Sequence, residues 1–482
     1  MARTLVIKSV KAAGRTFNVN KKLQIAPTLK KFMINFRRPS GYQGKYGFDW
    51  LRDEYIYPIE TVTNDNNGTA INAPTALCKN VAAIKTEYKT TDVVNPISPY
   101  GKEYYPAWLS ILPHTTTLQF KHGSSMHKNG VNLDLEIEEL ESLTSDATEI
   151  LFECNDNNVI ITPKKLKLKD LIDLKAGPKT KKLGGTTTRD YHLTTNKVNI
   201  KNTKSPLKGH EEIKVFAKLG TQKEEVGKLM LYKNDIIPKA EIVAVNVLIG
   251  GIGGKLRNDY EFIFKKQSFN QAQIRAEVKV DTKFDINRLP TTDANVANFI
   301  SDYSGGTLPS GKSTSDFTKE LILLYDTYGN HKPSGGKIDT NINKRTYLFF
   351  TNFKAGSTNG ICSADFNKDA AGNTISIDWG NAYIVFDSGS NSKRTFIHEC
   401  GHSFSLPHIF MEAGGKLKVS SSHIFHRGYT DNYMDYEWQI GARAPSGGYY
   451  SSGDNKYKGK MYSLFKWQWN IIRNDESLIT NY

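Results

Sequence analysis

The chain has 482 residues, 38% of them hydrophobic and 11% aromatic, and a formal net charge of +15 at pH 7. This composition excludes disorder along the whole chain, and the length favours two to four domains. No run of 18 apolar residues occurs, so we expect no membrane-spanning helix.

The positive charge is densest in residues 162–185, which we interpret as a solvated surface and a joint between β units. The sequence has no motif of a nucleic-acid-binding module, so we expect no nucleic-acid partner. The four cysteines lie far apart without a CxxC spacing and are expected to be free and buried: Cys78, Cys154, Cys362 and Cys400. A bridge between Cys362 and Cys400 remains an alternative, since both fall in one predicted domain.

The first predicted domain, residues 1–120, is rich in aromatic residues, glycine and turn formers, as in "FRRPSGYQGKYGFDWLRDEYIYPIE". This pattern predicts short strands and loops rather than helices, with the aromatic side chains forming a core. We interpret the region as a β module that serves in docking.

The second predicted domain, residues 121–240, contains short apolar runs at spacings near ten residues, the rhythm of an antiparallel β-sandwich. The strands are expected at 131–140, 148–154, 158–163, 197–202, 211–219 and 225–235. The "NDNN" segment at 155–158 predicts a hairpin-like turn between two of them. In rhythm, this region resembles an immunoglobulin-like module.

The third predicted domain, residues 241–482, mixes helices and strands, and we expect an α+β fold. It opens with a strand at 240–251, and helices are expected at 269–278 and 315–329. Strands at 345–353 and 381–387 then precede the segment "RTFIHECGHSFSLPHIF", residues 394–410. The "GGIGGK" segment lacks the full dinucleotide-binding pattern and is interpreted as a loop.

His398 and His402 are four residues apart, so on a helix they lie on one face and can reach one ion. Asn391 or Ser392 is the expected N-cap of that helix. A catalytic zinc ion keeps one coordination position open, and Glu399 could hold the bound water and take its proton. His408 is the natural third ligand, which requires the helix to end before Pro407.

The segment "HECGHSFSLPH" resembles the HExxHxxGxxH motif of the metzincin zinc endopeptidases, and "DNYMDY" is similar to their methionine turn. The NxMDY form is most similar to the pappalysin and cytophagalysin-like members, over residues 241–482 at most. The resemblance implies that His398, His402 and His408 bind one Zn2+ and that Glu399 is the general base. It also implies that Met434 forms a hydrophobic floor beneath the ligands.

The same resemblance assigns two further roles. Tyr436 would contact zinc or stabilise the oxyanion of the tetrahedral intermediate. The strand that precedes the motif would line the cleft and pair with the substrate backbone through Ala382, Tyr383, Ile384 and Val385.

Ser405 departs from the family pattern, which has glycine at this position because the turn is left-handed. Serine in that conformation costs about 1 kcal/mol, which metal coordination can offset. If the turn differs, the third ligand would come from another residue: Glu412, His423, His426, Asp431, Asp435 or Glu437.

These features predict a zinc-dependent endopeptidase with a protein or peptide substrate. The front half is similar to modules of cargo proteins of bacterial contractile injection and type VI secretion systems, which would make a secretion-apparatus protein a partner. The N-terminus lacks the pattern of a secretory signal, so we expect synthesis in the cytoplasm and then secretion or delivery by another route. The alternative is a non-enzymatic, metal-containing binding or structural component of such an apparatus, against which the presence of Glu399 argues.

Overall fold

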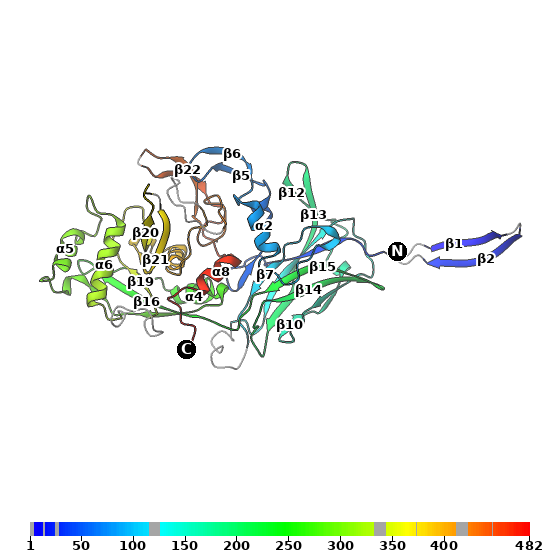
Figure 1. Ribbon diagram of the computed structural model, residues 1–482, viewed down its shortest axis with the longest axis horizontal. Coiled ribbons are helices and arrows are strands. Elements are labelled where there is room, and N and C mark those ends of the chain that lie inside the picture. The colour runs from blue at the N-terminus through cyan, green and yellow to red at the C-terminus, as the bar shows by residue number, and fades with distance from the viewer. Residues whose placement is uncertain are drawn as a thin grey trace.

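The computed structural model describes residues 4–12, 15–24, 28–114, 126–331, 344–372, 374–410, 423–445 and 447–482. Strands dominate, and they form several separate sheets. A β-sandwich lies at one end of the elongated molecule and a mixed sheet with helices at the other (Figure 1). A hairpin of β1 (Thr4–Ala12) and β2 (Arg15–Gln24) extends away from the sandwich.

The sandwich consists of two sheets that bury one common apolar core. One sheet contains β3 (Phe32–Arg37), β8 (Val131–Glu139), β10 (Val159–Thr162), β12 (Lys179–Gly184) and β13 (Thr187–Asn202). The other contains β4 (Gly47–Asp49), β7 (Ala107–Ser110), β9 (Glu149–Glu153), β11 (Lys165–Lys167), β14 (Glu211–Leu219) and β15 (Gln222–Leu231). Strands from before and after residue 120 therefore share both sheets.

Two local expectations for this region are wrong. The "NDNN" segment does not close a hairpin, because β9 pairs with β11 and β14 whereas β10 pairs with β13 in the opposite sheet. The lysine-rich segment 162–185 is not a joint, because it contributes one strand to each sheet, β11 and β12. Turn residues predict where the chain reverses, but the choice of partner strand depends on the distant core.

The segment between β4 and β7 packs against the C-terminal half of the chain. It contains α1 (Asp53–Ile56), β5 (Glu60–Asn64), β6 (Ala70–Thr75) and α2 (Val81–Lys89). The expectation of strands and loops without helices is therefore wrong for α2, whose first turn is capped by the Asn80 side chain. Backbone hydrogen bonds from Lys79 to Ile424 and from His426 to Leu77 fix this segment to the C-terminal half.

The mixed sheet has the strand order β17-β16-β19-β21-β20, with β20 antiparallel and the others parallel. Its strands are β16 (Lys239–Leu248), β17 (Arg275–Val280), β19 (Thr346–Phe350), β20 (Gly360–Lys368) and β21 (Thr374–Val385), and β18 (Phe284–Asp285) also pairs with β16. Helices α5 (Ala294–Tyr303) and α6 (Thr314–Tyr328) cover one face. Helices α4 (Tyr260–Lys266) and α7 (Lys393–His402) cover the other.

Alternation along β16 explains this two-sided burial. Val243, Val245 and Val247 face the core beneath α5 and α6, whereas Ile242 and Ala244 face the core that contains α7. The strand predicted at 240–251 and the helix predicted at 315–329 are confirmed by β16 and α6.

The helix expected at 269–278 is wrong. The chain forms one 3-10 turn, η4 (Phe269–Ala272), and then enters β17, which pairs in parallel with β16. Gln273 between them has φ 58°, a left-handed conformation that ends any helix. The local helix pattern is overridden by the pairing with β16, because strand partners dominate over intrinsic preference in a buried sheet.

The remaining elements are α8 (Lys466–Arg473), the hairpin of β22 (Trp438–Arg443) and β23 (Tyr449–Asp454), and short 3-10 turns η1 (Pro99–Gly101), η3 (Leu168–Asp170), η5 (Ile286–Arg288) and η7 (Asp387–Gly389). All four cysteines are free, and Cys154 alone among them is not fully buried, which confirms the expectation of unbridged thiols. Within the described ranges, no helix is long and apolar enough to cross a membrane.

Candidate metal centre

Helix α7 carries the motif histidines and begins where the sequence predicts. The Ser392 side chain accepts a hydrogen bond from the Thr395 N–H at 3.1 Å and so caps the first turn. The helix ends at His402, and the backbone N–H of Leu406 then bonds to the Gly401 carbonyl. Ser405 adopts φ 65°, so the chain reverses through a left-handed residue at this position.

The reversal brings three imidazoles together. The Nε2 atoms of His398 and His408 are 3.0 Å apart, and that of His402 is 3.2 Å from each. Two nitrogen ligands about 2.1 Å from one tetrahedral ion lie about 3.4 Å apart, so the observed spacing fits a shared cation. In the described part of the chain, this is the one cluster of histidine, cysteine or carboxylate groups that could hold a metal ion.

Backbone carbonyls lie beside the Nδ1 atoms of two of these histidines. His398 Nδ1 lies 2.8 Å from the Tyr433 carbonyl oxygen, and His402 Nδ1 lies 2.6 Å from the Leu406 carbonyl oxygen. A carbonyl only accepts, so Nδ1 of His402 carries the proton, whereas His398 Nδ1 also has a donor, Arg394 Nη2, at 3.0 Å. The lone pair of His402 is then on Nε2, which is the arrangement that metal-binding histidines generally show.

Arg394 adds a positive charge on the same helix, one turn before His398. Its Nη2 lies 3.0 Å from His398 Nδ1, and its Nε donates to the Asp435 carbonyl at 2.7 Å. Burial and the Arg394 charge hold the pKa of His398 well below its usual range, and burial does the same for His402. Both imidazoles are therefore neutral at pH 7, as a metal ligand must be.

Glu399 faces the same cleft and is almost completely buried, with 8% of its surface exposed. Burial raises its pKa to about 8, although the Arg394 charge and a hydrogen bond from the Cys362 backbone N–H act in the opposite direction. A divalent cation beside it would favour the carboxylate. A carboxyl group whose pKa lies near neutrality is suited to proton transfer.

The triad opens into a cleft of about 950 Å³. Its floor contains the three histidines and Glu399, and its walls are formed by β20, by the β21 residues Ile377–Gly380, by Tyr436 and by one side of α6. The Trp379 ring stacks on His402, with centroids 4.2 Å apart and planes 17° apart. This tryptophan was not anticipated, because its position depends on how two strands pair.

Met434 and Tyr436 both lie at the centre, from the loop that precedes β22. Met434 is fully buried, and a Cβ added to Gly401 would lie 2.7 Å from its sulfur, so the methionine packs against α7 between the two histidines. The Tyr436 ring is 5.2 Å from the His408 ring and 5.8 Å from the His398 ring. Tyr436 also lines the cleft.

The substrate strand was assigned to the wrong element. Ala382, Tyr383, Ile384 and Val385 lie in β21, which pairs with β19 on one side and with β20 on the other. All four side chains are buried, and their backbone groups are already used by neighbouring strands. The free edge beside the triad belongs to β20, which ends the sheet and lines the cleft. The sequence identifies a strand before the motif but does not reveal the order of strands in the sheet.

The alternative third ligands lie elsewhere, apart from Glu412, which is outside the described residues. Asp431 forms ion pairs with Arg38 and Arg52. The carboxylate of Asp435 accepts hydrogen bonds from backbone N–H groups, and so does that of Glu437. His423 and His426 are buried against other groups, away from the triad.

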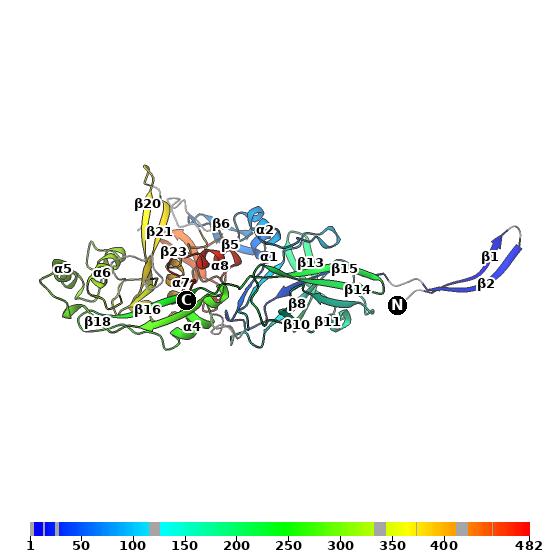
Figure 2. The same cartoon turned by 60° about the horizontal axis from the view of Figure 1, so that its bottom comes forward.

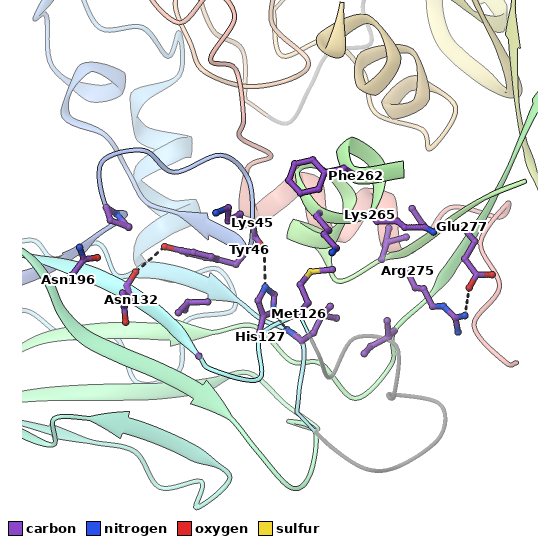
Figure 3. A pocket seen from close by; sticks show the side chains of 18 residues that line it. Lys45, Tyr46, Met126, His127, Asn132, Asn196, Phe262, Lys265, Arg275 and Glu277 are labelled. Atoms are coloured by element: carbon purple, nitrogen blue, oxygen red, sulfur yellow. Dashed lines mark hydrogen bonds and ion pairs between the residues drawn. The ribbon is translucent and has the colours of Figure 1, made fainter. Parts of the chain in front are cut away.

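A second cavity of about 610 Å³ lies where the sandwich meets α4 and β17 (Figure 3). His127 lines it, but both ring nitrogens are engaged, Nδ1 by the Leu112 N–H at 2.8 Å and Nε2 by the Lys45 carbonyl at 2.9 Å. Burial lowers the pKa of this histidine to about 4. Its described lining contains no metal-ligand cluster, so the candidate chemical site is the cleft above α7.

No protein-family model and no curated protein matches the chain. Among solved structures, the chain is similar to the crystal structure of metalloproteinase-II from Bacteroides fragilis. The sequence identity is 12%, the match covers 45% of this chain and 74% of that chain, and the TM-score is 0.21. A likeness of this size does not define a shared fold.

Proposed function

We propose that the chain is a zinc-dependent endopeptidase with a metzincin-like catalytic region. The observation that carries this proposal is the convergence of three Nε2 atoms within 3.2 Å of one another, with Glu399 in the same cleft. Imidazole ligands suit zinc, although several other divalent metals accept them. Three protein ligands leave a coordination position open, which distinguishes a catalytic site from a closed structural one.

In this proposal, each residue of the cleft has a separate role in the reaction. A zinc ion in the triad would polarise the scissile carbonyl and lower the pKa of water. Glu399 would accept the proton of the attacking water and pass it to the leaving amine. Tyr436 would donate a hydrogen bond to the developing oxyanion, and Met434 would keep the ligand histidines in place from below.

The substrate would lie along the free edge of β20. Strand addition there uses backbone hydrogen bonds and therefore tolerates many sequences, which suits an enzyme that acts on proteins. The non-enzymatic alternative is weaker, because a purely structural metal site does not need Glu399. This carboxyl group is not one of the three clustered histidine ligands, yet it is buried in the cleft, which costs free energy.

Metal analysis and proteolysis test the proposal together. We expect about one zinc per chain in the wild type and in Glu399→Ala, and loss of zinc in His408→Ala. Casein should be cleaved by the wild type alone. A wild type that binds no zinc from a zinc-containing buffer, or a Glu399→Ala variant with undiminished cleavage, would refute the proposed chemistry.

We also propose that this peptidase is delivered into a target cell by a secretion apparatus. The β1–β2 hairpin projects from the sandwich and is the segment best placed to contact a secretion apparatus (Figure 2). A chain that begins at residue 28 should then keep peptidase activity and lose export. Unchanged export of that chain would remove the hairpin from the delivery role.

A further inference from the structure

The hairpin of β20 and β21 has two chemically different faces. Residues directly opposite in an antiparallel pair point to the same face, and alternate residues share it. The register pairs Ala364 with Trp379 and Phe366 with Ile377, so these side chains lie together. Ile375 lies two positions beyond Ile377 toward the hairpin tip, at an irregularity in the register. Trp379 stacks on His402, which identifies this face as the one that looks toward the metal centre.

The opposite face is polar. Asp365 is paired with Asp378, and Asn367 donates to the Asp378 carboxylate at 2.9 Å and to Ser376 at 2.8 Å. Asp365 also lies 3.9 Å from Lys319 of α6. The hairpin is therefore amphipathic, with one face suited to water.

The apolar face is nevertheless exposed. We call Trp379, Ile377, Phe366 and Ile375 the apolar strip. Phe366 is 53% exposed and Ile375 is 48% exposed, although large side chains on a projecting hairpin gain nothing from contact with water. The hairpin rises from the sheet beside α7 (Figure 2). The strip runs outward along it, and the first three of its members line the catalytic cleft.

We propose that the apolar strip is a substrate-binding surface for an extended polypeptide segment with apolar side chains at alternate positions. A strand added to the free edge of β20 would direct every second side chain to the strip, at the spacing of Ala364 and Phe366. The strip is continuous with the catalytic cleft, so one chain can occupy both. The proposed substrate is an unfolded segment with apolar side chains that extends several residues beyond the part bound at the metal. This inference rests on the proposed peptidase function.

Binding tests the strip without requiring cleavage. The full chain carrying Glu399→Gln is titrated against fluorescein-labelled casein, an unfolded polypeptide, and the anisotropy is recorded. Adding Phe366→Ser or Ile375→Ser should each weaken binding about fivefold, since each removes a side chain that the substrate buries. Phe366→Leu should retain most of the affinity because it keeps the apolar contact.

Two matched controls separate the strip from general effects. Leu174→Ser removes an equally exposed side chain, 47% exposed, from the sandwich. Ser376→Ala changes the polar face of the same hairpin at a position outside the cleft lining. Both should leave the Kd within about twofold of the parent, because neither side chain contacts the substrate in this arrangement. Equal Kd values for Phe366→Ser and Leu174→Ser, or no saturable binding of casein, would overturn the inference.

Cleavage assays distinguish failure of the apolar-strip inference from failure of the proposed peptidase function. If the wild type cleaves casein while strip variants bind and cleave normally, the peptidase proposal stands and the strip is wrong. If strip variants lose binding while the wild type cleaves nothing, the strip is supported and the chemistry is wrong. With an active enzyme, kcat/KM for casein should fall in Phe366→Ser through KM, with kcat unchanged.

Discussion

At the scale of single residues, Ser405 shows how a departure from a motif is accommodated. Its φ of 65° is unfavourable for a residue with a Cβ, at a cost of about 1 kcal/mol. Its hydroxyl donates to the Asp475 carboxylate at 2.6 Å, a contact that glycine could not make. The side chain thus recovers part of the cost that its Cβ creates.

Substitution of Ser405 should separate these two effects. Ser405→Ala keeps the strain and loses the hydrogen bond, and we expect the free energy of unfolding to fall by about 1 kcal/mol. Ser405→Gly loses both and should be within about 1 kcal/mol of the wild type. Denaturant unfolding of the metal-loaded protein measures both values. A glycine variant less stable than the alanine variant would contradict the left-handed turn.

Tyr436 is the residue that we propose to stabilise the oxyanion, and substitution of its hydroxyl tests this role. Its ring lies against two ligand histidines, and the guanidinium groups of Arg394 and Arg427 lie 5.1 and 5.3 Å from its centroid. Tyr436→Phe should lower kcat about 100-fold with little change in KM, because an oxyanion donor acts in the transition state. Tyr450→Phe removes an exposed hydroxyl and serves as the control. A loss confined to KM would assign Tyr436 to substrate binding instead.

At the scale of elements, helix α7 and the loop that carries Met434 form one unit. The loop supplies the Tyr433 carbonyl, 2.8 Å from His398 Nδ1, and the backbone N–H of Ile409 reaches the Met434 carbonyl at 3.4 Å. Gly401 allows this closeness, because any Cβ there would overlap the Met434 sulfur. A glycine inside a helix normally costs about 1 kcal/mol relative to alanine, so its presence here reflects packing.

Gly401→Ala should therefore weaken metal binding even though alanine favours the helix. We expect about a tenfold loss in zinc affinity, measured by competition with a chelating dye, because displacement of Met434 moves the ligand histidines. Adding Met434→Ala should restore part of the affinity, since the two changes act on one contact. Additive losses in the double variant would show that the two residues do not interact.

The same elements show what sequence could and could not predict. The spacing of His398 and His402, the Ser392 cap and the helix end before Pro407 are local, and all are confirmed. Arg394 was missed, although its position one helical turn before His398 was a usable signal. The role of β20 and of Trp379 could not be predicted, because each depends on strand pairing across the sheet.

At the scale of the whole molecule, the front half of the chain supports the candidate metal centre. Arg52 Nη2 pairs with Asp431 at 3.0 Å, Arg38 pairs with the same carboxylate, and Ser463 donates to it at 2.8 Å. Asp431 adjoins Asn432, whose side chain accepts from the Met434 N–H at 2.9 Å. Arg38 and Asp431 are 393 positions apart, and a local sequence pattern cannot predict a contact over that separation.

Asp431 should make stability depend on pH in a defined direction. Burial raises its pKa, but the Arg38 and Arg52 charges outweigh burial and hold the pKa well below its usual range. The stabilisation is therefore complete above the unfolded pKa near 3.9 and is lost as pH falls toward the folded value. At pH 7, Asp431→Asn should cost about 3–5 kcal/mol, because two arginines lose their partner.

Thermal unfolding of the metal-free proteins checks this, since acid also removes metal from histidines. The difference in Tm between the wild type and Asp431→Asn should be constant from pH 7 to 5 and should shrink toward pH 3. Asp365→Asn, at an exposed site, is the control and should show little difference at any pH. A difference that grows in acid would mean that Asp431 is not the stabilised carboxylate.

The packing of the two halves also determines which truncated chains can fold. Leu51, Tyr55, Leu77, Tyr88 and Trp108 are buried in the same core as the side chains of α7 and α8. Removal of residues 1–240 would expose this core and leave Asp431 buried without its two cations. A fragment of 241–482, the catalytic domain predicted from sequence, should therefore be insoluble or unfolded by circular dichroism, and inactive.

A chain of residues 28–482 keeps every one of those contacts, so it should fold, bind zinc and cleave casein like the full chain. Adding residues 28–240 as a separate chain should restore partial structure to 241–482 if the interface is large enough to assemble without a covalent link. A soluble, active 241–482 fragment would contradict the shared core. The support of the metal centre by the front half would then have to be assigned to the C-terminal half alone.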